Sequence, residues 1–328
     1  MTRHLLRWIG LGLLTLVIVA VAFVLVQANR RPSLEGYARM PQAPVGTAIQ
    51  VRFAGVATLL FDDGETAWMT DGFFSRPSLA RTAFTRITPD RAAIDAGLKS
   101  LGVVRLAAVV PVHSHYDHAM DSPLVAMQTG ALLVGSESTL NVGRGLGMPE
   151  GRMRRVQPHD RMTFGRWTLT FLASKHVPLP ILREGEVETI DAPLVPPAHS
   201  LKWREGQTWA ILVEHPGTTP MLVLGSAGFV PGGLEGRHAG TVFLGVGSAG
   251  KQTPEYLSRW WDESVKRVGA KRVIPIHWDD FGEPLNKPLL AFPYLFDDLG
   301  VTMRHLTSWA ARDGVEVRLP PLFVPFAP

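Results

Sequence analysis

The stretch His113-Ser114-His115-Tyr116-Asp117-His118 carries three imidazoles and one carboxylate within six residues. It follows an apolar run, residues 106–112, that predicts a buried strand ending at His113. In an extended segment, residues i and i+2 point the same way, so His113 and His115 can converge on one metal ion. Asp117 and His118 are adjacent, so their side chains diverge and can hold a second ion beside the first. The alternative is a surface histidine cluster that binds no metal.

The composition restricts both the class of protein and the kind of metal site. Of the 328 residues, 46% are hydrophobic and 19% are charged, as in a globular protein with a substantial core. There is no cysteine, which excludes disulfides and thiolate-rich zinc sites and leaves His and carboxylate as metal ligands. The net charge of +4 is too small to indicate nucleic-acid binding, so no nucleic-acid partner is expected.

The N-terminal segment predicts a membrane helix. Residues 8–29 carry no charge and are dense in Leu, Val and Ile, which is long enough for a helix to cross a bilayer. Arginines flank this run on both sides, so the charge bias that sets orientation is nearly balanced. Because the segment before the run is short, we expect it to stay in the cytoplasm. The alternative is a signal peptide with its cleavage site at Val26-Gln27-Ala28.

The rest of the chain predicts a linker and one large domain. We expect a membrane anchor or signal over residues 1–29, a linker that contains several prolines over 30–48, and a catalytic domain over 49–328. Within that domain, strands come first as meanders and then alternate with helices. This order favours an α/β fold in which helices cover the outer sides of sheets.

Two Thr-Pro pairs predict helix starts in the catalytic domain. Thr88-Pro89 is a favourable N-cap followed by proline at the first helical position. Thr253-Pro254 opens a second helix that we expect to continue through Val268.

Several apolar strands end on a residue that can bind metal. These residues are Asp71, His113, His176 and His277. A lone histidine at a strand end is more often a satisfied polar residue than a ligand. Ligand sites of α/β proteins, however, gather beyond the carboxyl ends of strands, so their joint placement indicates a common site.

The sequence resembles the metallo-β-lactamase-fold hydrolases over about residues 49–310. The His113-x-His115-x-Asp117-His118 pattern is similar to the signature of that family. Residues 55–60 and 70–75 resemble the opening of the branch that includes ascorbate-phosphate lactonases and N-acyl-phosphatidylethanolamine phospholipases D. Residues 276–281 resemble its closing histidine motif.

This resemblance implies an αββα sandwich with metal ions at one edge. By position, the first ion would be bound by His113, His115 and His176, and the second by Asp117, His118 and His277. Asp71 would orient the ligands, and Asp117 and His118 would be catalytic. The expected cofactor is Zn²⁺, as one ion or two, with Mn²⁺ or Fe²⁺ as alternatives. The resemblance also implies a bacterial protein. Together with the N-terminal apolar run, this predicts an inner-membrane protein with a single membrane pass and a periplasmic catalytic domain, or a periplasmic protein if the signal is cleaved.

One position departs from the family pattern. The family has an aspartate that bridges the two metals in a Gly-Asp-Thr-Gly-like turn, whereas the matching segment here is Gly225-Ser226-Ala227-Gly228. A hydroxyl is a poor replacement for a carboxylate between two dications. We therefore expect the second site to be weaker, or to use a water or another acid such as Asp279 or Asp280.

The predicted activity is metal-dependent hydrolysis, in which the ion lowers the pKa of a bound water to about 7. The substrate would be an ester, phosphodiester or lactone, either a small molecule or a lipid-like one. The alternative is a non-catalytic metal- or ligand-binding envelope protein. Candidate substrate-binding residues are Tyr116, His199, Phe229, Trp278 and Asp279.

A glycine motif in the second half of the domain needs a separate interpretation. Gly245-x-Gly247-x-x-Gly250 matches a dinucleotide-binding fingerprint. It lacks the surrounding βαβ unit and the acidic residue that such a site requires, so it predicts a turn near the metal site instead.

Overall fold

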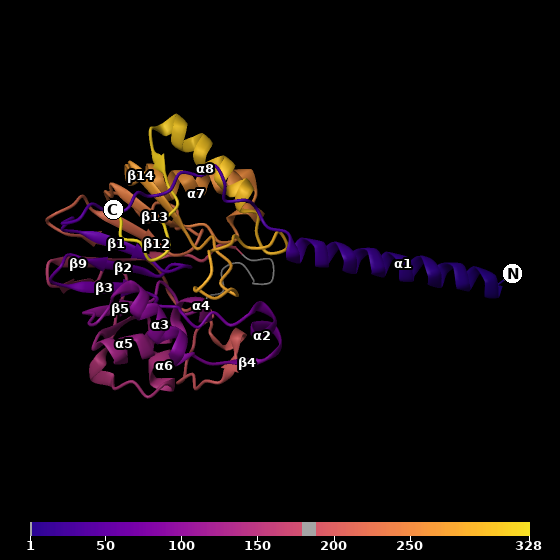
Figure 1. Cartoon of the computed structure of the whole chain (residues 1–328), viewed down its shortest axis with the longest axis horizontal. Coiled ribbons are helices and arrows are strands. Elements are labelled where there is room, and N and C mark those ends of the chain that lie inside the picture. Colours follow the sequence, from indigo (N-terminus) through magenta and orange to yellow (C-terminus); the bar gives the residue numbers. More distant parts are fainter. Residues whose placement is uncertain (1, 179–187) are drawn as a thin grey trace.

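The computed structural model describes residues 2–178 and 188–328. In these ranges most strands belong to two large sheets that lie face to face (Figure 1). The first sheet consists, in spatial order, of β1 (Gln50–Phe53), β2 (Leu59–Asp62), β3 (Ala67–Thr70), β5 (Ala108–Val110), β6 (Leu132–Gly135) and β7 (Met153–Arg155). The second consists of β15 (Glu316–Val317), β14 (Arg272–Ile276), β13 (Thr241–Gly245), β12 (Met221–Leu224), β11 (Thr208–Glu214), β9 (Trp167–Ser174) and β8 (Arg161–Phe164).

Helices cover the outer face of each sheet. The first sheet packs against α3 (Arg91–Leu101), α5 (Ser122–Thr129) and α6 (Glu137–Gly145), and the second against α7 (Pro254–Trp261) and α8 (Leu299–Asp313). Layers of helix, sheet, sheet and helix therefore follow one another, as the sequence predicted for this mixed α/β fold.

Aromatic side chains fill the space between the two sheets. Phe61 of β2 stacks on Trp68 of β3, with ring centroids 4.4 Å apart and planes inclined by 4°. Phe243 of β13 and Trp167 of β9 approach Phe61 edge-on from the second sheet. Aromatic rings bury large apolar areas, so this cluster joins the two sheets into one core.

Two helix boundaries refine the predictions from sequence. α3 begins two residues later than the Thr88-Pro89 pair suggests, because the Asp90 carboxylate accepts hydrogen bonds from the amides of Ala92 and Ala93 and so acts as the N-cap. Thr253 does cap α7, but the regular helix ends at Trp261 and continues as a wider π-helical turn, Asp262–Lys266.

α6 and α8 lie outside the elements predicted from sequence. In α8, the buried residues Leu299, Met303, Leu306 and Ala310 follow helical spacing. Asp298 caps its start, and Gly314 ends it in the left-handed conformation. The pattern for this helix was therefore present in the sequence.

The strand directions bring several chain segments to one edge. β3, β5 and β6 are mutually parallel, as are β12, β13 and β14. β9 and β12 each run antiparallel to β11, so they run parallel to one another. The carboxyl ends of β3, β5, β9, β12 and β14 lead into Asp71, His113, His176, Ser226 and His277, respectively. α4 (Tyr116–Ala119) lies at this edge (Figure 1).

α1 (Thr2–Asn29) projects away from the body as a single long helix (Figure 1). Residues Arg7–Asn29 are long and apolar enough to cross a membrane, and no part of that span is buried against the body. A cleavable signal sequence would satisfy the same criteria. The predicted linker then runs along the body, where Met40 is buried and its amide donates to the carbonyl of Leu319.

Candidate metal centre

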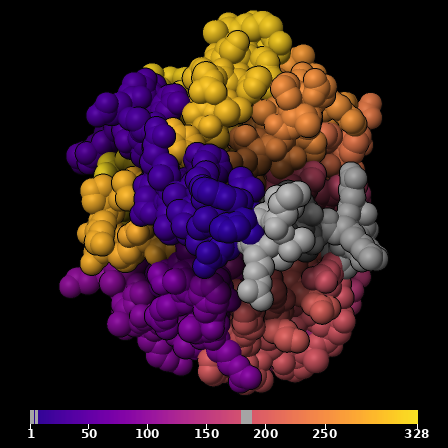
Figure 2. All heavy atoms as spheres, turned by 90° about the vertical axis from the view of Figure 1, so that its right-hand side faces the viewer, coloured from indigo at the N-terminus to yellow at the C-terminus, as the bar shows by residue number. Residues whose placement is uncertain are grey.

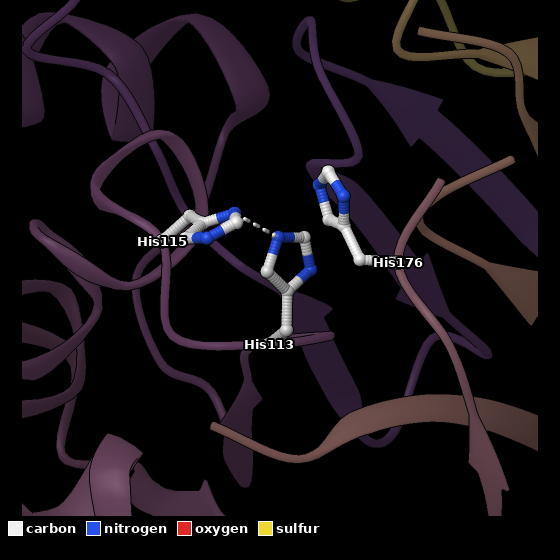
Figure 3. Close-up of side chains that lie close together, drawn as sticks. All are labelled: His113, His115 and His176. Atoms are coloured by element: carbon white, nitrogen blue, oxygen red, sulfur yellow. Dashed lines mark hydrogen bonds between the residues drawn. The ribbon is translucent and has the colours of Figure 1, made fainter. Parts of the chain in front are cut away.

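The first group of candidate ligands consists of His113, His115 and His176. Their available ring nitrogens all lie within 4.8 Å of one another. Nε2 of His113 is 3.0 Å from Nδ1 of His115, and the His176 ring approaches both from the end of β9 (Figure 3). Nδ1 of His176 donates to the carbonyl of Val177 at 2.8 Å, which leaves Nε2 free to bind a metal.

The second group consists of Asp117, His118 and His277. Nε2 of His118 lies 3.2 Å from Nε2 of His277. An Asp117 carboxylate oxygen lies 3.6 Å from the first of these nitrogens and 3.4 Å from the second. The two groups adjoin, because the rings of His113 and His118 have centroids 4.0 Å apart. The structure thus brings all six predicted ligands together at one edge.

Asp71 lies directly behind the second group, fully buried. One carboxylate oxygen accepts from Nδ1 of His118 at 2.7 Å, and the other accepts from the amide of Val112 at 2.9 Å. The first contact directs Nε2 of His118 toward His277, and the second fixes the backbone just before His113. The position of Asp71 therefore fits the orienting role that the sequence predicted.

The environment keeps the first group neutral. Burial is the main cause that lowers the pKa of His115 to about 4, and burial together with the nearby His115 lowers the pKa of His176 to about 3. Burial also lowers the pKa of His113 well below its usual value. Only neutral imidazole binds a metal, so these three side chains are ready to bind at neutral pH.

The second group has the opposite balance of charge. Burial acts to raise the pKa of Asp117, but His118 and His277 outweigh it and hold that pKa well below the usual value. Burial acts to lower the pKa of His118, but the carboxylates of Asp71 and Asp117 outweigh it and raise that pKa. Asp117 is therefore an ionised carboxylate next to two imidazoles.

Both groups fit a divalent metal ion. Tetrahedral ligands at 2.0–2.1 Å from zinc lie roughly 3.3 Å from one another, close to the 3.0 Å and 3.2 Å separations of the ring nitrogens. The ring nitrogens of His113 and His115 face each other in the first group, and those of His118 and His277 do so in the second. The nitrogen and carboxylate donors suit zinc, manganese and iron.

Ser226 supports the first group through the backbone. Its hydroxyl accepts a hydrogen bond from the amide of Val177 at 3.0 Å, so it helps hold the segment that carries His176. Among the described residues, no carboxylate takes over the bridging role expected at this position. Asp279 pairs with Arg76 and Asp280 with Arg31, with N–O distances of 2.7 Å and 2.6 Å.

The glycine motif packs against the site, as the sequence predicted. A Cβ atom on Gly247 would lie 2.9 Å from Nδ1 of His277, and one on Gly245 would lie 2.5 Å from the backbone of Gly225. Side chains at these positions would displace the His277 loop and the Ser226 turn. The motif therefore allows close packing beside the metal-binding residues.

The candidate substrate-binding residues Tyr116, His199 and Phe229 lie in different parts of the structure. Tyr116 lies in α4 and packs edge-on against Phe281. His199 is half-buried in the short β10 (Ala198–His199), which pairs with β4 (Arg86–Ile87). Phe229 packs against Tyr256 of α7, with ring centroids 5.3 Å apart.

The other two candidates are placed differently from the sequence-based expectation. Trp278 is buried in the core, where its ring packs near Phe53. Asp279 is fully buried and accepts from the amide of Val56 at 2.8 Å. Neither side chain reaches solvent. The prediction placed both on a substrate surface because they follow His277, but the chain turns into the interior at that point.

The structure also reveals a supporting residue that sequence reasoning missed. The Arg76 guanidinium lies in the interior and binds the Asp279 carboxylate, the Asp280 carbonyl and the Glu283 carbonyl. Its partner Asp279 lies 203 positions further along the chain. No short motif joins the two, so no signal in a single sequence would have found the pair.

Substitution of Asp71 by Asn tests its orienting role. An amide has one acceptor oxygen, so it cannot accept from both the Val112 amide and His118 as the carboxylate does. We expect the affinity of the second group for metal to fall about 10–100-fold, measured by metal titration of the full chain. Asp95→Asn, at an exposed position of α3, is the matched control. Equal affinities for the two variants would show that Asp71 does not orient His118.

No family model and no curated protein sequence matches this chain. Solved structures do resemble it. The isothiocyanate hydrolase from Delia radicum gut bacteria has 15% identity and a TM-score of 0.52, over 85% of this chain and 98% of that one. A structure described as "a possible metal-dependent hydrolase from Veillonella parvula DSM 2008" has 13% identity and a TM-score of 0.50, over 85% and 99% of the two chains.

A further neighbour carries the family name. The metallo-β-lactamase fold protein YhfI from Bacillus subtilis has 14% identity and a TM-score of 0.45, over 86% of this chain and 92% of that one. The fold of this chain thus resembles that of solved structures described as an isothiocyanate hydrolase and a possible metal-dependent hydrolase. At these identities the likeness concerns the fold.

Proposed function

We propose that this chain is a zinc-dependent hydrolase. The observation that carries the proposal is the convergence of two ligand groups, His113/His115/His176 and Asp117/His118/His277, at one edge of the sandwich. Three neutral imidazoles on one side and an ionised carboxylate with two imidazoles on the other suit two adjacent divalent cations. Structural neighbours described as metal-dependent hydrolases support the same class of reaction.

The protein side chains have distinct tasks in this reaction. A divalent cation would supply the acidity that turns water into a nucleophile and would stabilise negative charge on the substrate. Asp117, held ionised, can accept a proton or orient a water between the two groups. Asp71 holds His118 in one orientation through Nδ1, and the Val177 carbonyl does the same for His176.

For the substrate we propose an ester, phosphodiester or lactone with lipid-like character. The supporting features are the apolar α1 and the resemblance of residues 55–60 and 70–75 to the branch that contains phospholipases D and phosphate-ester lactonases. For the location we propose an inner membrane with the body in the periplasm, or release to the periplasm after cleavage. The mass of the mature chain distinguishes the two, because only an anchored chain retains α1.

Ser226 favours a second candidate function, a non-catalytic metal- or ligand-binding envelope protein. Its hydroxyl occupies the sequence position at which the resemblance places a bridging carboxylate, and it is already used by the Val177 amide. Metal analysis of the purified full chain is the first test, because a chain without zinc, manganese or iron contradicts the hydrolase proposal. Hydrolysis of a panel of esters, phosphodiesters and lactones by the metal-loaded chain is the second.

Substitution of Ser226 by Asp tests the weakness of the second site. A carboxylate at this turn adds an anionic ligand beside Asp117 and should raise the affinity for a second dication. We expect the metal content to rise from about one ion per chain toward two, measured by elemental analysis after dialysis. Ser258→Asp, on the exposed side of α7, adds the same charge far from the site and should leave the metal content unchanged. If the wild-type chain already binds two ions firmly, Ser226 does not weaken the second site.

A further inference from the structure

The attachment of α1 to the body sets which face of the protein points toward a membrane. The carbonyl of Gln27, in the last turn of α1, accepts from the amide of Leu295 at 3.1 Å. Just beyond the helix, the Arg30 carbonyl accepts from the amide of Tyr294 at 3.0 Å. Arg31 donates to the Asp280 carboxylate at 2.6 Å and to the Ala291 carbonyl at 2.8 Å. Because these contacts begin within the helix, the body is fixed against the C-terminal end of α1 and is not attached to it by a free linker.

The metal centre lies at the same end of the body. α4, which carries Asp117 and His118, is on the side from which α1 leaves (Figure 1). A run of aromatic contacts joins the two regions: Tyr116 packs on Phe281, Phe281 on Phe292, and Phe292 on Phe296. Phe281 also contacts the ring of His277. The segment that holds α1 is thus packed directly against the second ligand group.

A small subdomain on this side presents apolar side chains to solvent. It consists of α2 (Leu79–Phe84), β4, β10 and the 3-10 turn Ser200–Lys202, and its two halves are joined by strand pairing and by a hydrogen bond from Ser200 to the carbonyl of Thr82. Phe84 is 86% exposed and Leu201 is 73% exposed. We call these two residues the apolar tip.

Cationic side chains belong to the same short elements as the apolar tip or to the adjoining strand. Arg81, Arg86 and Lys202 are all exposed, and we call them the cationic rim. No acidic residue occurs within α2, β4 or the 3-10 turn. Apolar residues flanked by Lys and Arg are typical of surfaces that bind the interface of an anionic bilayer, where the rings enter the headgroup boundary and the cations pair with phosphates.

More apolar residues lie next to the end of α1. Leu290, Leu295 and Phe296 are between 38% and 45% exposed. Leu295 is itself bonded to the last turn of α1. Figure 2 looks directly at this face, with α1 projecting toward the viewer near its middle and segments from distant parts of the chain around it. Figure 1 places α2 and β4, the elements that carry or adjoin the apolar tip, on the side of the body from which α1 leaves.

We propose that this face rests on the surface of an anionic phospholipid bilayer, with the apolar tip inserted among the headgroups. α1 and the apolar tip then form two contacts with the same bilayer, and the edge that carries the metal-binding residues faces the lipid. This inference rests on the proposed membrane anchoring by α1, and it agrees with a substrate drawn from the membrane surface.

The absence of cysteine allows a direct test on the full chain. Phe84→Cys and Leu201→Cys each provide one site for a nitroxide spin label in protein reconstituted into vesicles of phosphatidylglycerol and phosphatidylcholine. Val104→Cys is the matched control, because Val104 is 84% exposed and precedes β5, at the end of the sheet opposite the metal centre. Accessibility to oxygen and to a water-soluble nickel chelate reports the depth of each label.

We expect labels at positions 84 and 201 to be several-fold more accessible to oxygen, and less accessible to nickel, than the label at 104. Replacing Arg81 and Lys202 by Glu, or using phosphatidylcholine alone, should reduce this difference. If the labels at 84 and 201 behave like the label at 104 in anionic vesicles, the docking proposal is overturned.

Carbonate extraction of the same vesicles tests the anchor separately. If the labels are immersed in the bilayer before extraction and carbonate then releases the chain, the docking surface is supported and the membrane anchor is rejected. If the chain resists extraction but all three labels stay in water, the membrane anchor is supported and the docking surface is rejected. Release of a chain whose labels were never immersed would reject both.

Discussion

His115→Ala is expected to abolish metal binding by the first group and to reduce hydrolysis more than a hundredfold. Loss of a residue that only orients a ligand already costs about 10–100-fold in affinity or activity, so loss of a ligand should cost more. The imidazole of His115 lies 3.0 Å from that of His113, and its removal leaves only two nitrogens for the first ion. The measurements are metal content by elemental analysis and hydrolysis of the ester, phosphodiester and lactone panel.

A matched control is available at His238. This histidine is exposed and belongs to neither ligand group, so His238→Ala removes an imidazole without touching the site. His115 occupies the N-cap position of α4 but makes no side-chain capping bond, so its loss should leave the melting temperature of the metal-free chain almost unchanged. Activity that survives His115→Ala with full metal content would disprove the assignment of the first group.

The sequence indicated one common site because each candidate ligand follows a recognisable strand or lies in a short motif, and the resemblance to a known family assigned the ligands to two groups. His113, His115, Asp117 and His118 share six residues, where the spacing itself carries the chemistry. His277 follows a five-residue buried strand. Strands that run parallel in a sheet bring their carboxyl ends together, so separate strand ends were enough to predict one site.

Contacts made by backbone loops were beyond such reasoning. The residues after His277 were expected to face the substrate, yet Trp278 enters the core and Asp279 binds Arg76. Which side a loop residue faces depends on how the chain turns, and the turn at His277 uses a left-handed backbone conformation with φ of 59°. Neither apolar alternation nor helical spacing applies there, so periodicity gives no information about side-chain direction.

The attachment of α1 shows the same limit at larger scale. Composition alone identified an apolar helix and a proline-containing segment after it, and a segment of that kind is typical of a flexible linker. The structure instead has Arg31 bonded to Asp280, 249 positions away. A single pair at that separation leaves no pattern in one sequence, although it determines how the body is oriented relative to α1.

Arg76→Ala is expected to cause the largest loss of stability among substitutions outside the ligand groups. Asp279 would remain buried with its charge unpaired, and breaking a buried ion pair in this way costs about 3–5 kcal/mol. In thermal unfolding of the detergent-solubilised full chain, this corresponds to a fall in Tm of roughly 6 °C or more. The double variant Arg76→Met/Asp279→Asn removes both charges and keeps an acceptor for the Val56 amide, so it should recover most of the lost stability.

The same substitution should weaken the second ligand group in particular. Asp279 accepts from the amide of Val56 at 2.8 Å, and the carbonyl of Val56 accepts from the amide of His277 at 2.6 Å. Arg76 is therefore linked to His277 by three successive hydrogen bonds, by way of Asp279 and Val56. We expect Arg76→Ala to lower the affinity of the second group for metal while His113, His115 and His176 bind as tightly as before, measured by metal titration, because a ligand loop released from its support binds metal less tightly. An equal fall in the affinity of both groups would mean that the pair stabilises the fold as a whole and does not position His277.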